Sequence, residues 1–250
     1  MLLFCREQTL LNSKRLPTFT DENNLKGTLP TELQALSSLN DLEFVSNFLN
    51  ATIPSVYGQL SALKTLNLQE NRIGGPLPAG LFQATSLTML DLETNQISGT
   101  IPIAISQLTS LDILQLGNNM LTGQVPTSIP SSIRFLLLNN NALTGPIPST
   151  LRKNVNLNAI DVGSNKIGGT LPAFFGSLTD LTTINVFNNT MSGTIPSSLG
   201  NLGKLTNLFL HFNNFRGTMP QSICALNLEQ LTADCLNGTP VVCTCCTLCF

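Results

Sequence analysis

Charged side chains are scarce in this sequence of 250 residues. They make up 10% of it, where an ordinary soluble domain has about 25%. The formal net charge is −2 and no run of Lys or Arg occurs, so nucleic acid is not expected as a partner. No stretch approaches the roughly 18 apolar residues that a membrane-spanning helix needs. The polar character comes instead from Asn, Thr, Ser and Gly, which predicts an uncharged surface.

Histidine occurs only once, as His211. Ser-His-Asp and Cys-His mechanisms both need a histidine with a nucleophile at matching depth, and no obvious nucleophile accompanies this one. The sequence also contains no GxxxxGK[ST] motif, glycine-rich kinase loop or HRD stretch. We therefore expect no enzyme activity, no catalytic residue and no cofactor.

A secretion signal is not recognisable at the start of the chain. The apolar run before Arg6 and Glu7 has four or five residues, whereas a signal peptide needs an apolar core of about 7–15. Two interpretations follow: the protein stays in the cytosol, or the true N-terminus lies upstream.

Asparagine recurs at a fixed interval through the chain, in steps of 24 residues with one step of 22. An LxxLxL-like run precedes the copies from Asn47 onward, whereas the run before Asn23 is degenerate. An apolar residue follows each Asn two positions later, and Pro follows seven positions later. Gly stands four after the Asn in eight of nine copies, with Ala51 the exception. Such registered repetition is typical of a solenoid. The nine copies are Asn23, Asn47, Asn71, Asn95, Asn119, Asn141, Asn165, Asn189 and Asn213.

Each column of the repeat has a physical role. The LxxLxL run alternates and predicts a short strand, and strands stacked about 4.8 Å apart form a parallel sheet over a shared core. The Asn is expected to point inward where the chain leaves the strand, because its amide offers both a donor and an acceptor. Gly fits a crowded corner, and Ala51 suggests that crowding matters there more than φ. Pro fixes φ on the outer arc.

The step of 22 lies between Asn119 and Asn141. Leu136 and Leu138 keep the strand register before Asn141. We therefore expect the two missing residues to shorten the outer arc, with no bulge in the sheet.

The pattern LxxLxLxxNxLxGxIPxxL resembles the plant-type leucine-rich repeat of receptor-like kinases, receptor-like proteins and polygalacturonase-inhibiting proteins. The resemblance covers about residues 20–235. It implies a right-handed horseshoe or superhelix of the α/β class, with short parallel strands on the concave face and 3₁₀ or extended segments on the convex face. The ending "LTADC…VCTCCTLCF" is similar to that of diatom and related stramenopile members.

The domain organisation expected from this pattern has three parts. Residues 1–20 form a degenerate N-terminal segment without the family's cysteine cap, residues 21–223 form nine turns, and residues 224–250 form a cysteine-rich C-terminal cap. The missing N-terminal cap suggests that the chain is the C-terminal part of a longer protein or a shortened gene product.

Six of the seven cysteines follow residue 220, where a solenoid must close its open hydrophobic end. Disulfides are the favoured interpretation, with Cys5 left over, and the sequence cannot choose among the 15 pairings. A zinc site is the rival, although the adjacent Cys245 and Cys246 do not form two separated CxxC knuckles. A redox CxxC at residues 246–249 would need a βαβ setting. The expected disulfide cysteines are Cys224, Cys235, Cys243, Cys245, Cys246 and Cys249.

Disulfides favour an oxidising compartment, so we expect an extracellular or cell-surface location and an incomplete N-terminus. Three sequons fit this location, although an Asn- and Thr-rich chain also produces sequons by chance. The glycosylation candidates are Asn50, Asn188 and Asn237.

The outward strand positions on the concave face carry information because the scaffold does not dictate them. Early strands are polar and acidic, and the carboxylates are expected to be exposed. A glycosidase-like carboxylate pair is disfavoured because an open sheet provides no pocket. Later strands carry outward aromatic rings, which either bind a partner or pack on one another and on the cap. The expected ligand-binding residues are Glu43, Asp91, Glu93, Phe135, Phe187, Phe209, His211 and Phe212.

Together these patterns favour a non-catalytic recognition module that binds a protein, peptide or glycan. The resemblance implies a receptor-like protein in signalling or defence and favours a membrane-anchored full-length protein. The alternative is a secreted inhibitor of cell-wall-degrading enzymes. A third reading is an ice-binding surface, because Thr stands two before the Pro in six turns. Those residues are Thr28, Thr52, Thr100, Thr170, Thr194 and Thr218.

Overall fold

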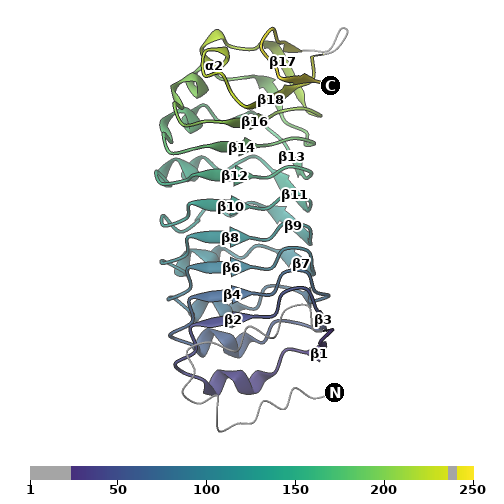
Figure 1. Ribbon diagram of the computed structural model, residues 1–250, viewed down its shortest axis with the longest axis vertical. Helices are drawn as coiled ribbons and strands as arrows, with labels where there is room; N and C mark the ends of the chain where they lie inside the picture. Colours follow the sequence, from purple (N-terminus) through teal and green to yellow (C-terminus); the bar gives the residue numbers. More distant parts are fainter. Residues whose placement is uncertain (1–23, 236–240) are drawn as a thin grey trace.

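The protein is a solenoid whose turns stack along one axis (Figure 1). A computed structural model describes residues 24–235 and 241–250. Each complete turn contributes a strand to a main sheet, a segment of a second row of strands and, in most turns, a short 3₁₀ helix. The predictions for residues 1–20, Cys5, Asn23 and Asn237 concern positions outside the described residues.

The main sheet has ten strands, and every pair is parallel. The prediction of a short parallel strand before each Asn is confirmed for Asn47 to Asn213. The strands are β2 (Asp41–Glu43), β4 (Thr65–Asn67), β6 (Met89–Asp91), β8 (Ile113–Gln115), β10 (Phe135–Leu137), β12 (Ala159–Asp161), β14 (Thr183–Asn185), β16 (Asn207–Phe209), β18 (Gln230–Ala233) and β20 (Leu248–Cys249).

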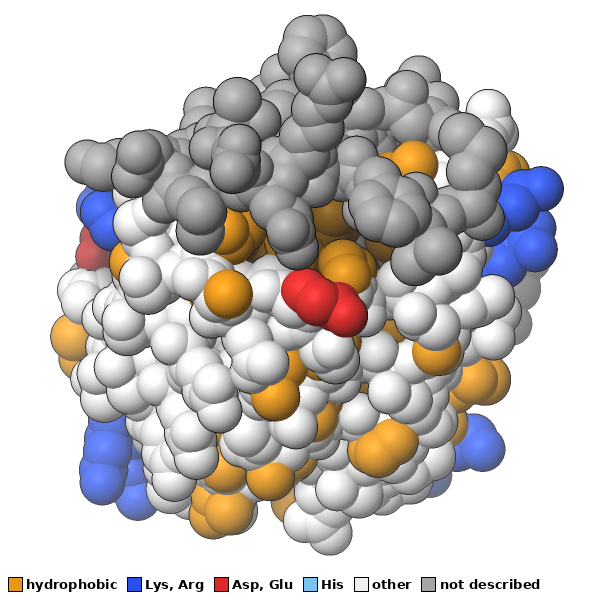
Figure 2. Space-filling view, turned by 90° about the horizontal axis from the view of Figure 1, so that it is seen from below, with side chains coloured by type: hydrophobic (Ala, Val, Ile, Leu, Met, Phe, Trp, Pro, Cys, Tyr) orange, Lys and Arg blue, Asp and Glu red, His pale blue; other side chains and the backbone are white. Residues whose placement is uncertain are grey.

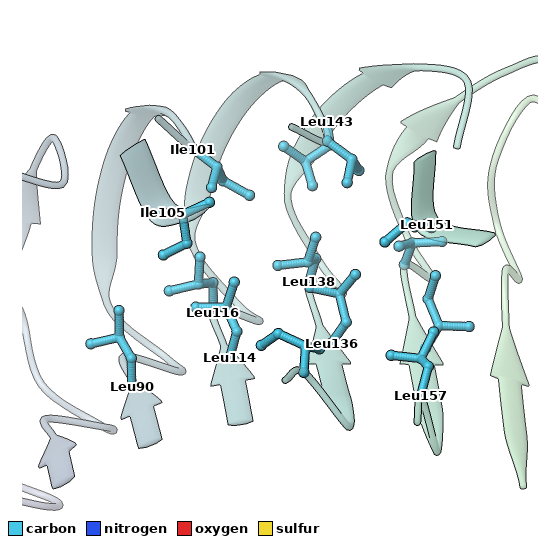
Figure 3. Packing of buried hydrophobic residues seen from close by; sticks show 14 of the residues in the cluster. Leu90, Ile101, Ile105, Leu114, Leu116, Leu136, Leu138, Leu143, Leu151 and Leu157 are labelled. Carbon is cyan, nitrogen blue, oxygen red and sulfur yellow. The ribbon is translucent and has the colours of Figure 1, made fainter. Parts of the chain in front are cut away.

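The core lies directly behind this sheet. The central residue of each three-residue strand is apolar and buried, as Leu90, Leu114 and Leu136 show with no exposed surface. Figure 3 shows these side chains meeting Ile105 and Leu143 from the opposite side of the turn. Since no single turn can enclose its leucines, burial of apolar surface requires the neighbouring turns.

A second row of parallel strands, which the sequence analysis did not predict, runs along the side of the stack (right side of Figure 1). It forms three sheets that follow the Asn of each turn. Their strands are β1 (Lys26–Thr28) with β3 (Phe48–Asn50); β5 (Gly74–Gly75), β7 (Gln96–Thr100), β9 (Met120–Gln124), β11 (Ala142–Gly145) and β13 (Lys166–Ile167); and β15 (Ser192–Thr194), β17 (Asn214–Thr218) and β19 (Val241–Val242).

The convex side carries 3₁₀ helices, each beginning directly after a repeat proline. Proline suits this place because its fixed φ is compatible with the helix start and no N–H is needed there. The helices are η2 (Thr31–Ala35), η3 (Ser55–Gln59), η4 (Ala79–Gln83), η5 (Ile103–Gln107), η6 (Ser149–Lys153), η7 (Ala173–Ser177) and η8 (Ser197–Asn201), and α2 (Gln221–Cys224) takes this place in the last turn.

The shortened turn confirms the prediction for the 22-residue step. Leu136 pairs with Leu114 in unbroken register, and the convex segment after Pro126 contains no helix. Asn154 stands at the end of η6, where the other 3₁₀ helices end in Leu or Ala, and it is 2% exposed. Its Nδ2 donates to Pro130 O at 2.6 Å. This hydrogen bond compensates for the missing helix of the preceding turn.

The asparagines form a ladder through the interior. Asn95 Nδ2 donates to the carbonyls of Leu92, Glu93 and Leu68 at 2.9–3.2 Å, and its Oδ1 accepts from Ile73 N at 2.9 Å. Leu68 and Ile73 belong to the preceding turn, so each amide joins two turns. The same contacts recur from Asn71 to Asn213, which confirms the predicted role of the Asn.

The expectation that crowding matters more than φ at the glycine column is wrong. The eight glycines have φ between 72° and 103°, and Ala51 has a φ of 65°. A Cβ at Gly27 would meet no atom within 4 Å. The left-handed backbone at this bend is therefore the common requirement, and Gly meets it without the steric cost that Ala51 carries.

The C-terminal cap replaces the turn that would otherwise follow. Three disulfides join Cys224 to Cys245, Cys235 to Cys249 and Cys243 to Cys246, which confirms the disulfide interpretation and gives the pairing. In earlier turns, the N–H groups around each ladder Asn donate to carbonyls of the next turn.

Asp234 takes over this function at the end of the stack. Its carboxylate accepts from Phe212 N at 2.7 Å and from Asn213 N at 3.0 Å. One carboxylate thus satisfies two N–H groups that would otherwise lack their partners in a following turn.

Within the described residues, no helix has the length and apolarity required to cross a membrane. Charge is also sparse on the end of the stack seen in Figure 2, where most described side chains are uncharged. This agrees with the low charged fraction of the sequence.

Candidate functional site

The concave face of the main sheet presents three columns of outward side chains. They are the first and third residues of each strand and the residue two positions further on. From β2 to β16, none of these positions holds Lys or Arg, whereas five hold a carboxylate. The described concave face is therefore acidic at one end and, from β14 onward, aromatic.

The acidic half is built on a local hydrogen bond that repeats in several strands. The side-chain oxygen of the third strand residue accepts from the backbone N–H two positions later. Asp91 accepts from Glu93 N at 3.0 Å and Asp161 from Gly163 N at 2.9 Å. Asn67 and Asn185 make the same bond, so a neutral amide fits this position as well as a carboxylate does.

The expectation that Asp91 is exposed is wrong, because Asp91 is only 2% exposed. Neighbouring side chains cover the Asp91 carboxylate, and its hydrogen bond from Glu93 N holds it against the backbone, so little of it contacts water. Burial raises the pKa of Asp91 to about 6, the Glu93 N–H bond opposes the shift, and the nearby Glu93 charge adds to it. Burial likewise raises the pKa of Asp161, against the hydrogen bonds from Gly163 and Asn185.

Glu93 is half-buried and held by amides of the following turns. Gln115 Nε2 donates to its Oε2, and Asn118 Nδ2 donates to its Oε1 at 3.0 Å. Asn140 Nδ2 in turn donates to Asn118 Oδ1 at 2.8 Å. This polar row fixes several side chains across adjacent turns, so a ligand meets a preorganised surface there. Glu43 is half-buried at the same sheet position as Asp91, two strands away.

The aromatic half brings together four rings. Phe187 stacks on His211 with centroids 5.1 Å apart, and Phe250 stacks on the imidazole at 4.2 Å. Phe212 meets both His211 and Phe250 edge-on, at 5.0 and 5.2 Å. We call Phe187, His211, Phe212 and Phe250 the aromatic cluster. Sequence reasoning missed Phe250, because its ring reaches back to His211 from the last residue of the cap.

Phe212 is the most accessible ring of the cluster, 53% exposed. Its φ is 55°, a left-handed conformation that bulky side chains rarely adopt. The seven equivalent residues in the earlier turns share this φ but are Ser, Glu, Thr or Asn. Phe212 therefore departs from the small or polar residues that the other turns carry at this place.

Phe135 and Phe209 do not join the cluster. Both are half-buried in β10 and β16, and neither ring stacks on another aromatic ring among the described residues. The guanidinium of Arg134 lies 5.7 Å from the Phe135 centroid. Phe209 faces outward beside the cluster and extends it toward the start of β16. Phe135 is more distant, because its strand β10 lies three strands from β16.

His211 has a hydroxyl partner that the sequence did not reveal. Its Nδ1 lies 2.7 Å from Thr232 Oγ1, but Thr232 is only 4% exposed, so this hydroxyl is not open to a substrate. Burial lowers the pKa of His211, and the Asp234 charge opposes that shift.

Three of the cysteines that a zinc site could use lie close together. The Sγ atoms of Cys235, Cys246 and Cys249 lie within 4.8 Å of one another. All three are in disulfides, so they offer no thiolate to a metal. Of the predicted glycosylation sites, Asn50 and Asn188 are exposed, and glycosylation stays a prediction.

Comparison with known proteins supports the repeat assignment. Leucine rich repeat models match residues 61–121, and also 132–154, 180–202 and 204–226. No curated protein matches the sequence.

Solved structures are similar over most of the chain. The TDR receptor is 33% identical with a TM-score of 0.81 over 84% of this chain and 37% of that one. The plant peptide hormone receptor RGFR1 in complex with RGF2 is 34% identical, with a TM-score of 0.79 over 84% of this chain and 34% of that one. This chain thus spans about a third of those receptors.

A plant ice-binding protein is 28% identical with a TM-score of 0.66, over 87% of this chain and 79% of the other. Similarity of this kind joins proteins with different partners, so the ligand must be argued from the residues themselves.

The buried carboxylate of Asp91 leads to a prediction about stability. Replacing Asp91 with Asn keeps the acceptor for Glu93 N, as in Asn67, and removes a buried charge. Since the folded pKa is raised from 3.8 to about 6, folding favours the protonated acid, and wild-type stability falls as pH rises from 4 to 7. We expect Asp91→Asn to raise the free energy of unfolding at pH 7 by about 1–3 kcal/mol.

Urea unfolding at pH 4 and pH 7 measures this effect, and the gain should nearly vanish at pH 4. The reciprocal variant Asn185→Asp should lose stability at pH 7, because it places a carboxylate beside Asp161. A gain for Asp91→Asn that is equal at both pH values would contradict the electrostatic explanation.

Proposed function

Because this chain belongs to the leucine-rich repeat family, we propose that it is a non-catalytic recognition module whose concave face binds a protein, peptide or glycan. The aromatic cluster with its exposed Phe212 is the observation that carries this proposal. Large rings on a rigid surface provide binding area at low entropic cost, and such rings often dominate binding energies.

The charge of the concave face limits the chemical classes of ligand that it can bind. An acidic, cation-free surface favours neutral or basic ligands, because it repels anionic ones. The polar row around Glu93 can hydrogen-bond an extended ligand, and the rings from β14 onward can accept its apolar end. The similar plant peptide hormone receptor RGFR1 is in complex with RGF2, which supports a peptide as the ligand of the present chain.

We place the protein in an extracellular or cell-surface setting, as part of a receptor-like protein. Three disulfides support an oxidising environment. A secreted inhibitor of cell-wall-degrading enzymes would use the same scaffold, and inhibition of a polygalacturonase by the purified protein would favour that alternative.

The binding proposal predicts the effect of removing two rings. Selection of a synthetic peptide library on the wild-type protein should yield binders, and Phe187→Ala with Phe209→Ala should weaken their binding by at least about 100-fold, since burying one large apolar side chain contributes roughly 1.5–3 kcal/mol. The melting temperature should change little because both side chains are half-buried.

Phe174→Ala provides the matched control, because Phe174 is also half-buried but lies in η7 on the convex side. It should leave peptide binding unchanged. Equal binding by the double variant and the wild-type protein would exclude the aromatic surface as the binding site.

A second candidate function rests on the side of the stack. Thr52, Thr100, Thr170 and Thr194 are exposed, and the γ-methyl of each lies over the glycine of the following turn, within 2.7–3.5 Å of where a Cβ would stand. The repeated placement of these γ-methyl groups forms an array that suits ordered water. Pro76, Gln124 and Pro146 interrupt it.

If this array binds ice, the wild-type protein should inhibit ice recrystallisation. Thr100→Lys should abolish that inhibition, whereas Thr88→Lys, outside the array, should not. Absence of inhibition by the wild-type protein would eliminate this candidate and leave peptide binding unaffected.

A further inference from the structure

The ring of Phe250 covers part of the aromatic cluster. The Phe250 ring lies on one side of the His211 ring, with an interplanar angle of 16°, and the Phe187 ring is also stacked with His211, at 21°. Phe250 follows β20, which is two strands beyond the β16 strand that precedes His211. The ring therefore reaches back across β18 to cover a side chain of the proposed binding surface.

A small set of contacts holds this segment in place, and three of them are hydrogen bonds of 2.8–3.0 Å between Thr247 and Leu231. β20 has two residues and pairs only with β18, and Phe250 N donates to Ala233 O at 3.0 Å. Leu248 is 53% exposed, so it contributes little apolar burial. The Cys235–Cys249 disulfide is the covalent bond that ties the segment to β18 at the residue before Phe250.

A second disulfide lies against this one. Cys246 is bonded to Cys243, yet its Sγ lies within 4.8 Å of both Cys235 Sγ and Cys249 Sγ. Thiol–disulfide exchange needs a thiolate close to a disulfide sulfur, and Cys246 would meet this condition once its own bond opened. The Cys243–Cys246 bond closes a loop of three residues, against 14 for Cys235–Cys249, so it restricts the unfolded chain least.

We propose that the cap is a thiol–disulfide exchange site in which opening of the Cys243–Cys246 bond releases Phe250 from the aromatic cluster. A dithiol reductant transfers two electrons to Cys243–Cys246, becomes a disulfide itself and leaves two thiols. The Cys246 thiolate then attacks Cys249 Sγ, the Cys246–Cys249 bond forms, and the Cys235–Cys249 bond breaks. Cys235 leaves as a thiolate and takes a proton from water.

The exchange changes what holds Phe250. In the product, Cys249 is bonded to Cys246, three residues earlier in the same segment, and no longer to Cys235, which follows β18. The segment then keeps the pairing of β20, the Phe250 backbone hydrogen bond and the hydrogen bonds between Thr247 and Leu231. The residue before Phe250 is no longer bonded to Cys235, and movement of the Phe250 ring makes His211 accessible from that side. The consequence for ligand binding rests on the proposed function, whereas the exchange and the release of Phe250 do not.

Alkylation after limited reduction tests the exchange. The folded protein is treated with dithiothreitol and quenched with iodoacetamide, and its peptides are mapped by mass spectrometry. We expect alkylated Cys243 and Cys235 together with a new Cys246–Cys249 bond. In the double variant Cys243→Ser with Cys246→Ser, the Cys235–Cys249 bond should open at least about tenfold more slowly, because the internal thiolate is absent.

Two results would overturn the exchange. One is equally fast opening of Cys235–Cys249 in the wild-type protein and the double variant. The other is reduction of Cys235–Cys249 while Cys243–Cys246 is still intact. Either would show that the two disulfides react independently.

The release of Phe250 has its own measurement, because His211 is the only histidine in the chain. Its pKa, lowered by burial, should rise toward its ordinary value in the NMR titration of the reduced protein. Phe250→Ala should produce the same rise without reductant and should show no further rise on reduction. An unchanged His211 titration in the exchanged protein would refute the release.

Binding of the selected peptides to the reduced protein separates this inference from the proposed function. Stronger binding after exchange supports both. A raised His211 pKa with no peptide binding in either redox state supports the exchange and release but contradicts the proposed concave binding site.

Discussion

The interior amide of the repeat asparagine is the interaction on which this structure depends. Where the chain leaves each main-sheet strand, several backbone groups point into the solenoid without partners in their own turn. One Asn side chain satisfies carbonyls of two turns and accepts an N–H from the earlier one, as Asn95 does. Burial of the leucines and satisfaction of the backbone therefore both require a neighbouring turn, and the repeat follows from that requirement.

The same requirement explains the end of the stack and the place of the proposed function. After the last Asn, no identical turn follows, and the carboxylate of Asp234 and three disulfides take its place. Departures from the repeat gather at this end: Phe212 stands where other turns have Ser, Glu, Thr or Asn, and Phe250 lies across His211. Side chains that the scaffold does not need are the ones free to serve recognition.

Much of the fold could be predicted because the period is read directly from the spacing of Asn, Gly and Pro. The parallel main sheet, the inward Asn and the short outer arc before Asn141 follow from it. The second row of strands did not, because residues such as Gly74 and Gly75 have low strand propensity and pair only because adjacent turns align them. The φ of Ala51 was misread for a related reason: a single exception to Gly says nothing about its own backbone.

The candidate site was predictable in part. Alternation placed Phe187 and His211 outward in neighbouring turns, and their rings meet. It could not show that Asp91 is buried, since burial depends on how neighbouring side chains cover it. Nor could it bring Phe250 to His211, because that contact depends on disulfide pairings that sequence leaves open.

Equilibrium unfolding of Asn95→Asp at pH 7 tests the central claim most directly, with Gln96→Glu as the control that adds the same charge at an exposed neighbour. The carboxylate cannot donate to the carbonyls of Leu68, Leu92 and Glu93, so the account predicts a loss of at least about 3 kcal/mol in the free energy of unfolding. Gln96→Glu should lose almost nothing. Equal, small losses for both variants would contradict the claim that the asparagine amide holds the turns together.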